Sequence, residues 1–140
     1  MAIAPTHSYV VVDTNVIIYL ITGSAQADRF APYLTGQTVL VSFQTVAELK
    51  LIALRRGWGQ QKLDQLDQVL RAMVVVPATE QITDRWARLM ASQTTAGSRV
   101  DIADAWIAAT ALTFDCPVVT NDRGDFERIS GLVLLPPAAS

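Results

Sequence analysis

The run Tyr9-Val10-Val11-Val12-Asp13-Thr14-Asn15 sets the fold class, because four apolar residues, three of them β-branched, end abruptly at an acidic one. Apolar residues fill every position of its first part, which is typical of a strand covered on both faces in a parallel sheet. Similar runs at residues 39–41, 73–76 and 118–120, and a weaker one at 132–135, predict four further strands.

Segments with helical spacing separate these runs. They are residues 25–34, 43–56, 62–71, 81–92 and 102–114. The last segment carries no charge after Asp104, which predicts a helix that is packed on most sides and covers the sheet. Strands that alternate with helices predict an α/β sandwich.

Length and composition narrow the function classes. The 140 residues predict a single domain over residues 1–140, with Lys+Arg 11 against Asp+Glu 13 and no strong overall attraction to nucleic acid. One histidine, His7, and one cysteine, Cys116, argue against zinc and disulfide chemistry. Neither a signal-like start nor a membrane-length apolar stretch is present, so we expect a cytoplasmic protein without a membrane partner.

Four acidic residues occupy positions that a parallel sheet brings to one rim. Asp13 directly follows the first strand, and Asp122 lies two residues beyond the fourth. Asp104 opens the helix that runs down into the fourth strand, so it is expected at the same carboxyl rim. Glu48 lies about 8 Å down the helix after the second strand, at 1.5 Å per residue, but its long side chain leans back toward that rim.

Each acid also has an ordinary structural interpretation. Asp13 is a preferred N-cap residue, and Asp101 with Asp104 resembles a capping box. Residues 120–124 have the composition of a turn, and Glu48 fits a solvated helix face. It is less expected that all four ordinary interpretations hold together than that the four acids share one site.

A shared site of carboxylates needs a counter-charge. Two carboxylates 5 Å apart repel by about 3 kcal/mol at an effective dielectric near 20. Oxygen ligands without His or Cys select Mg²⁺, with Mn²⁺ as the alternative. Such an ion binds phosphate oxygens and lowers the pKa of a water molecule. No Gly-rich phosphate loop is present, so hydrolysis of a phosphodiester is the favoured chemistry.

Four motifs in order resemble the PIN-domain ribonucleases, and among them the VapC-type toxins of toxin–antitoxin pairs. They are Val12-Asp13-Thr14-Asn15, residues 42–49, residues 104–111, and residues 119–126 followed by Gly131-Leu132. The resemblance implies a three-layer α/β/α domain with a Mg²⁺-dependent endoribonuclease site.

The resemblance also assigns roles by position. Asp13, Glu48 and Asp104 match the first three acids of the family, and either Asp122 or Asp125 completes the metal shell. Supporting groups that orient these acids are expected to be Thr14, Asn15 and Asn121. The residue before Asp104 is Ala103 where relatives carry Asn, and Asp101 is a candidate to replace that polar contact.

Two arginines flank the acids in the sequence. Arg99 and Arg123 are candidates to hold RNA phosphates, and ordinary solvated arginines are an equally good interpretation.

The resemblance further implies an RNA substrate, a cognate antitoxin and a toxin homodimer. An apolar groove for the antitoxin is expected from Tyr33, Leu34, Leu51, Leu54 and Trp58, although core packing is the favoured interpretation for Leu51 and Leu54.

Two other classes remain open at this point. One is a non-catalytic PIN-like interaction module or regulator, which would need at least one acid replaced. The other is an aspartyl phosphatase or receiver-like domain, for which neither Lys50 nor Lys62 follows a strand closely.

Overall fold

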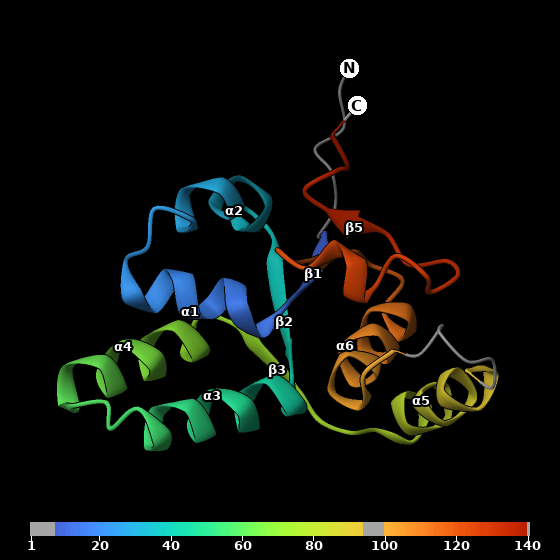
Figure 1. Cartoon of the computed structure of the whole chain (residues 1–140), viewed down its shortest axis with the longest axis horizontal. Coiled ribbons are helices and arrows are strands. Elements are labelled where there is room, and N and C mark those ends of the chain that lie inside the picture. Colours follow the sequence, from blue (N-terminus) through green and yellow to red (C-terminus); the bar gives the residue numbers. More distant parts are fainter. Residues whose placement is uncertain (1–7, 94–99, 140) are drawn as a thin grey trace.

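The computed structural model describes residues 8–93 and 100–139 (Figure 1). Its strands are β1 (Tyr9–Val12), β2 (Thr38–Ser42), β3 (Val74–Val76), β4 (Val118–Val119) and β5 (Leu134–Leu135). Its helices are α1 (Thr14–Thr22), α2 (Ala27–Leu34), α3 (Phe43–Arg55), α4 (Gln60–Arg71), α5 (Glu80–Ser92), α6 (Ile102–Thr113) and the short 3₁₀ helix η1 (Arg123–Asp125). Within the described ranges, none of the helices combines the length and the apolar character needed to traverse a lipid bilayer.

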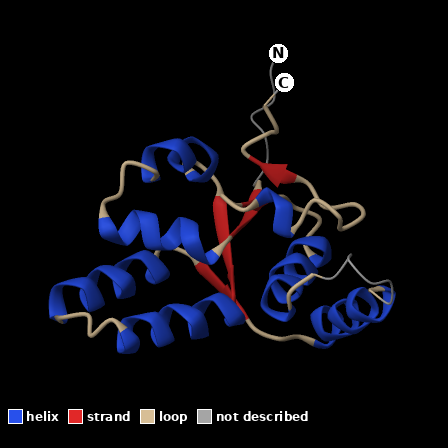
Figure 2. Cartoon of the chain, in the orientation of Figure 1, coloured by secondary structure: helices blue, strands red, loops and turns tan. Residues whose placement is uncertain are grey.

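All five strands form one parallel sheet in the order β3-β2-β1-β4-β5. The strand β1 lies at the centre, paired with β2 on one side and β4 on the other. Helices α1 to α4 lie on one side of the sheet, and α5 and α6 lie on the other (Figure 2). The predicted three-layer α/β/α architecture with a parallel sheet is therefore confirmed.

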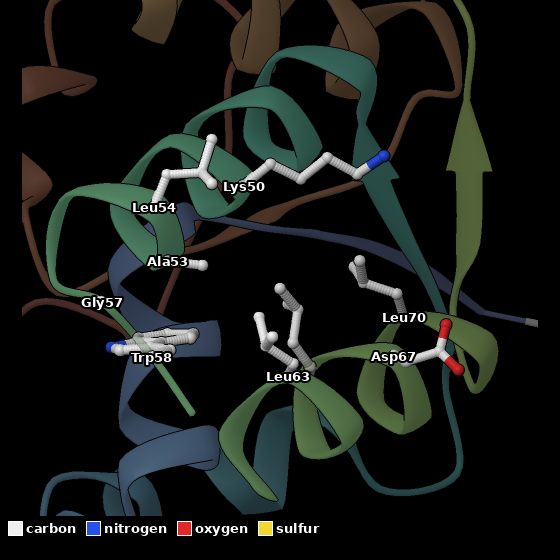
Figure 3. A pocket seen from close by; sticks show the side chains of 9 residues that line it. Lys50, Ala53, Leu54, Gly57, Trp58, Leu63, Asp67 and Leu70 are labelled. Atoms are coloured by element: carbon white, nitrogen blue, oxygen red, sulfur yellow. The ribbon is translucent and has the colours of Figure 1, made fainter. Parts of the chain in front are cut away.

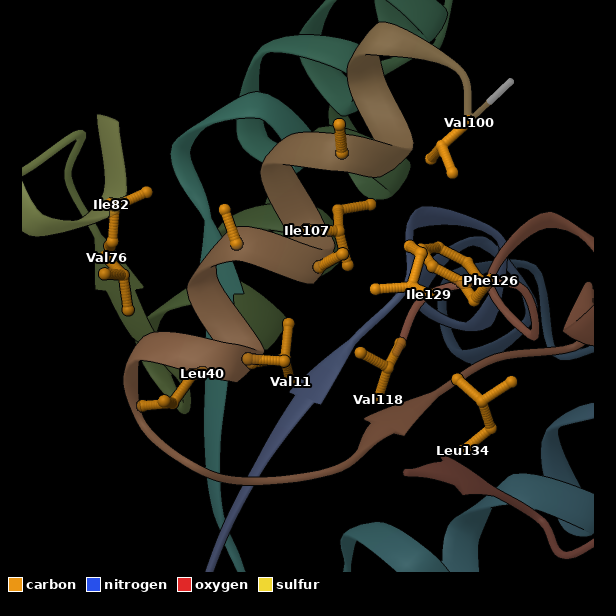
Figure 4. Packing of buried hydrophobic residues seen from close by; sticks show 14 residues of the cluster. Val11, Leu40, Val76, Ile82, Val100, Ile107, Val118, Phe126, Ile129 and Leu134 are labelled. Atoms are coloured by element: carbon orange, nitrogen blue, oxygen red, sulfur yellow. The ribbon is translucent and has the colours of Figure 1, made fainter. Parts of the chain in front are cut away.

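Alternate residues of the central strand supply the two halves of the core. Val11 packs in the cluster under α6, while Val10 and Val12 pack in the cluster under α1 and α3. This two-sided burial explains why the strand is apolar at every position. Figure 4 shows α6 lying across the sheet, with Ile107 directed toward the strands. The prediction that α6 is packed on most sides is confirmed, since Ala105 and residues 107–111 of this helix are buried.

One helix was not predicted from the sequence, and the predicted burial of one strand was too high. Helix α1 lies directly after β1, in a stretch for which no helix was predicted. Strand β3 was expected to be covered on both faces, but Val74 and Val75 are 49% and 46% exposed. The reason is topological, because β3 is an edge strand at the end of the sheet.

Candidate active site

Six carboxylates come from segments at the carboxyl rim of the sheet. Asp13 directly follows β1, Asp122 directly precedes η1, and Asp125 lies in η1 shortly after β4. Asp104 lies in the first turn of α6, and Asp101 caps the amino end of that helix. Glu48 lies in the second turn of α3, which begins where β2 ends. Parallel topology thus brings together residues that are far apart in the sequence.

Asp13 is the most buried of these acids, with 5% of its surface exposed. Its Oδ1 accepts a hydrogen bond from the backbone N–H of Thr14 (2.7 Å), and its Oδ2 accepts one from the hydroxyl of Thr120 (2.7 Å). Burial raises the pKa of Asp13 most, those two hydrogen bonds lower it, and the charges of Asp122 and Asp125 raise it further. Asp13 is therefore both the N-cap of α1, as one interpretation expected, and a member of the acidic cluster.

Asp104 has the most strongly raised pKa of the cluster. Burial raises its pKa first, and the charges of Asp13, Asp125, Asp101 and Glu48 raise it further, to about 7. All four of the charged groups named here are carboxylates. At neutral pH this part of the molecule therefore favours uptake of a proton or of a cation.

Glu48 belongs to the same cluster. Burial raises the pKa of Glu48, the side-chain amide of Gln44 lowers it, and the charges of Asp13 and Asp101 raise it. The amide nitrogen of Gln44 lies 3.5 Å from Oε1 of Glu48, one helical turn away on α3. The interpretation of Glu48 as a simple solvated residue is therefore wrong, because this side chain is partly buried and coupled to the acids of two other elements.

The two candidates for the fourth acid have different surroundings. Oδ2 of Asp122 accepts a hydrogen bond from the side-chain amide of Asn15 (2.8 Å). The charge of Asp122 raises the pKa of Asp13 and of Asp125. The charge of Asp125 raises the pKa of Asp13 and of Asp104. Asp125 therefore interacts electrostatically with Asp104 on α6, whereas Asp122 is fixed by the side-chain amide of Asn15.

Of the three residues expected to support the acids, Thr14 and Asn15 contact an acid of the cluster, and Asn121 contacts other residues. Asn15 contacts the acid Asp122 directly, and the backbone of Thr14 contacts Asp13, while the Thr14 hydroxyl donates to that of Thr45 (3.1 Å). Asn121 has different partners. Its amide donates to the Tyr19 hydroxyl (3.1 Å), and its carbonyl accepts from the guanidinium of Arg29 (3.0 Å).

Thr120 is a supporting residue that was not predicted from the sequence. Its hydroxyl donates to Asp13 and accepts from the backbone N–H of Asp122 (2.9 Å). The sequence signal was its place at the end of β4, one strand away from Asp13 in the sheet.

Asp101 was expected only as a helix cap and as a substitute polar contact. It does cap α6, because its side chain accepts from the backbone N–H of Ala103 (3.2 Å). Its charge also raises the pKa of Glu48, Asp104 and Asp125, so it belongs to the cluster electrostatically. The signal available in the sequence was its position one helical turn before Asp104.

Of the two arginines expected at the RNA phosphates, one can be placed. The guanidinium of Arg123 donates to the backbone carbonyls of Leu134 (3.3 Å) and Pro136 (2.7 Å), which ties η1 to the end of β5. Arg99 lies outside the described residues. Phosphate binding by either arginine remains a prediction.

The residue types at the rim suit a hard divalent ion. Oxygen atoms of several carboxylates, with no His or Cys among them, are the ligands that Mg²⁺ and Mn²⁺ prefer. Across residues 8–93 and 100–139, no three Asp, Glu, His or Cys side chains are grouped closely enough to hold one ion directly. The residue types therefore fit such an ion, and their present positions require side-chain rotation or intervening water molecules as ligands.

An apolar groove of about 500 Å³ lies between α3 and α4 (Figure 3). Leu54 and Trp58 line it as expected, together with Leu63 and Leu70 of α4. The expectation that Leu54 is a core residue is wrong, since it is 81% exposed.

The other residues expected in the groove lie elsewhere. Leu51 is 44% exposed, so the core interpretation is wrong for it as well, but it is not among the groove residues. Tyr33 and Leu34 pack against the core on the α1 side.

Comparisons with known proteins agree with this geometry. The PIN domain family model matches residues 10–132. Ribonuclease VapC5 of Mycobacterium tuberculosis is 34% identical over 124 residues, covering 86% of this chain and 87% of that protein. Ribonuclease VapC1 of Haemophilus influenzae is 30% identical over 129 residues, covering 86% of this chain and 91% of that protein.

A solved structure shares the arrangement of elements. VapBC-5 from Mycobacterium tuberculosis, described as a member of the VapBC family of toxin-antitoxin systems, superposes with a TM-score of 0.68 at 28% identity. The match covers 91% of this chain and 97% of that one. Sequence match, fold and the acidic rim agree, and the chain therefore belongs to the PIN-domain family and, within it, to the VapC-type ribonucleases.

Proposed function

We propose that the acidic rim is the active site of a Mg²⁺-dependent endoribonuclease that acts as the toxin of a type II toxin–antitoxin pair. The observation that carries this proposal is the convergence of Asp13, Glu48, Asp104 and Asp125 from four elements into one electrostatically coupled cluster. Membership of the VapC-type ribonucleases supports RNA as the substrate.

The ion would be held by Asp13 and Asp104, directly or through water, with Glu48 and either Asp122 or Asp125 completing the site. Mg²⁺ is the expected ion and Mn²⁺ the alternative. When bound, such an ion supplies charge for the phosphate oxygens and acidifies a water molecule.

Hydrogen bonds within the chain fix the orientation of two of the carboxylates. Both oxygens of Asp13 are held, by the Thr14 amide and the Thr120 hydroxyl, so this side chain has one defined orientation. Asn15 fixes one oxygen of Asp122 in the same way. Groups that hydrogen-bond to metal ligands tune metal affinity by about 10- to 100-fold, so these contacts support Asp13 and Asp122 as members of the site.

The test is cleavage of RNA by the full chain with Mg²⁺ and after its removal with EDTA. Asp104→Asn is expected to lower the rate by about 100-fold or more, since the removed charge lies at the centre of the cluster. Asp64→Asn is the matched control, because Asp64 is an exposed acid on α4 whose side chain contacts Gln60. Cleavage that persists at the full rate in Asp104→Asn would contradict the assignment of the acidic rim as the active site. No cleavage by the unsubstituted chain with Mg²⁺ would contradict the proposed activity and favour a non-catalytic PIN-like module.

An antitoxin is the expected protein partner. The solved relative belongs to a toxin-antitoxin system, and the groove of about 500 Å³ between α3 and α4 offers an apolar surface for side chains of a partner helix. We expect a small protein encoded next to this chain to place apolar side chains over Leu54. Leu54→Asp should abolish copurification of that protein without altering RNA cleavage by the free toxin, and retained copurification would contradict the assignment.

Cytoplasmic location and a homodimer complete the proposal. A toxin that cleaves RNA would act in the cytoplasm. Size-exclusion chromatography with light scattering of the purified chain tests the homodimer, and a monomer at all concentrations would exclude it.

A further inference from the structure

A second concave surface lies outside the acidic rim, between α5 and residues 128–130. It is a hollow of about 440 Å³ whose walls include Arg85, Arg88 and Arg128. A further hollow of about 500 Å³ shares Arg85 and Arg88 with it. We call the surface formed by these three arginines the arginine hollow.

The arginine hollow is positively charged in a protein whose net charge is −2. Among the described residues that line the two hollows, the one acid is Asp84, whose Oδ2 lies 2.8 Å from Nε of Arg88. Both side chains of this pair are largely exposed, at 78% for Arg88 and 60% for Asp84, so the pair is weak and easily exchanged for another partner. A guanidinium has five N–H donors, and one such bond leaves most of them available to a ligand.

The remaining lining is mixed in a way that suits a nucleotide. Leu89 and the buried Ile129 provide an apolar floor, and Ser92 and Ser130 provide hydroxyl groups. Arginine guanidinium groups match phosphate oxygens, hydroxyl groups match ribose, and an apolar surface matches the face of a base. An acidic peptide would use the arginines but would gain less from the other groups.

Two residues that line the arginine hollow, Gln93 and Arg128, connect it along the chain to acids of the rim. Gln93, at one end, accepts a hydrogen bond from the backbone N–H of Val100 (3.0 Å), and the next residue is Asp101 of the acidic cluster. Arg128, on the opposite wall, follows Asp125 by three residues. The hollow therefore begins close to Asp101 and extends to Leu112, near the end of α6 that lies opposite Asp104.

We propose that the arginine hollow binds the phosphate backbone of the RNA substrate beside the cleaved bond. This inference rests on the proposed function, and it gives a reason for the arrangement of charge. Carboxylates around a bound ion offer no positive side chain to the neighbouring phosphates, so a separate cationic surface adds affinity there, and phosphate contacts position a nucleic acid without reading its sequence.

The test measures RNA binding by fluorescence anisotropy, with a fluorescein-labelled single-stranded RNA of mixed sequence and the full chain. Asp104→Asn serves as the background in every arm so that the probe is not consumed. The double substitution Arg85→Ala/Arg88→Ala is expected to raise Kd by about tenfold or more at about 0.1 M salt. The slope of log affinity against log salt should become shallower by about 0.7 for each phosphate that the variant no longer binds.

The matched control is Arg55→Ala/Arg56→Ala, which removes the same charge from the exposed carboxyl end of α3. Its Kd is expected to stay within about twofold of the background protein. Arg85→Lys/Arg88→Lys should retain part of the affinity, because the charge remains while the fork of donors is removed. In the active protein, Arg85→Ala/Arg88→Ala should raise KM with little change in kcat, since these residues lie outside the reacting centre.

The outcomes separate this inference from the proposed function. If the unsubstituted chain cleaves RNA but Arg85→Ala/Arg88→Ala binds the probe as tightly as the background protein, the inference is overturned and the proposed function stands. An equal loss of affinity in the Arg55/Arg56 control also overturns it. RNA binding that depends on the hollow in a chain without cleavage supports the inference and contradicts the proposed function. Displacement of RNA by polyglutamate at equal charge concentration would assign the hollow to an acidic protein instead and overturn the RNA assignment.

Discussion

The hydroxyl of Thr120 lies 2.7 Å from Oδ2 of Asp13, which joins the ends of β4 and β1 across the acidic rim. Both residues are buried, at 1% and 5% exposed, and the same hydroxyl accepts the backbone N–H of Asp122. One side chain thus holds the most buried acid of the site and the start of the segment that carries Asp122 and Asp125. The orientation of the carboxylates therefore depends on a neutral residue.

Thr120→Val tests this dependence, because valine keeps the shape of threonine and removes the hydroxyl. We expect RNA cleavage to fall by about 10- to 100-fold, the range found for groups that orient metal ligands. The free energy of unfolding should fall by about 1–3 kcal/mol, because a buried carboxylate oxygen and a backbone N–H lose their partner. Thr120→Ser restores the hydroxyl and should recover most of the activity. Full cleavage by the valine variant would show that Asp13 needs no such support.

The stability of the protein without added metal should fall as the pH rises from about 4 to about 7. The pKa of Asp104 is raised from 3.8 to about 7 in the folded protein, so between these values the folded state binds a proton that the unfolded state has released. Protonation therefore stabilises the folded state at low pH, and this contribution is lost as the pH passes through the folded pKa. Thermal unfolding in EDTA at several pH values measures the effect.

Asp104→Asn provides the check on that assignment, since asparagine cannot ionise. The variant should melt at a higher temperature than the natural sequence at about pH 8, by about 2–4 °C for each kcal/mol of repulsion removed. The two proteins should approach each other in stability near the ordinary pKa of an aspartate, at about pH 4. A variant that is less stable in the alkaline range would place the unfavourable charge elsewhere.

Mg²⁺ should stabilise the protein and release protons on binding. A concentration about ten times the Kd adds about 1.4 kcal/mol to the free energy of unfolding through mass action. The pKa of Asp104 is raised to about 7, so this side chain is partly protonated slightly below neutral pH, and the ion displaces that proton. Calorimetric titration in two buffers of different ionisation enthalpy counts the protons released. Heat that is identical in both buffers would indicate that the ion binds away from the acids.

Arg123→Ala should destabilise the fold by about 1.5–3 kcal/mol, because its guanidinium binds the carbonyls of Leu134 and Pro136. Chemical denaturation measures this, with Arg71→Ala as the control for loss of a surface charge, since Arg71 is exposed and paired with Asp67 one turn away. The same variants report on RNA affinity. A change in affinity with unchanged stability would favour the predicted phosphate contact over the structural one.

The sheet and the placement of Asp13, Glu48 and Asp104 near its carboxyl rim could be predicted, because each depends on local chemistry and on one topological rule, whereas their roles as metal ligands stay a prediction. Apolar runs identify buried parallel strands, and residues at the carboxyl ends of such strands share a rim. Helix α1 was missed because Val16, Ile17 and Ile18 are β-branched, a composition that indicates a strand more strongly than a helix. Burial of this helix against the sheet and the surrounding helices overrode that local preference.

The remaining misses concern residues with two uses. Asp101 has the sequence context of a helix cap and is one, and its charge on Asp104 adds a second role that the capping pattern does not reveal. The exposure of Leu54 follows from the way α3 and α4 lie against each other, which no periodicity specifies. Local patterns therefore identify the elements, while side-chain partners across elements require the assembled fold.

The scattered origin of the acids has a consequence for synthesis of the protein. Asp13 is made early, whereas Asp104 and Asp125 come late, and β4 must insert beside β1 before Thr120 can reach Asp13. A nascent chain that ends before β4 lacks Asp122 and Asp125 and the partner of its first acid. Such a fragment lacks part of the proposed metal site, so under the proposed function we expect RNA cleavage to begin only after almost all of the chain has been synthesised.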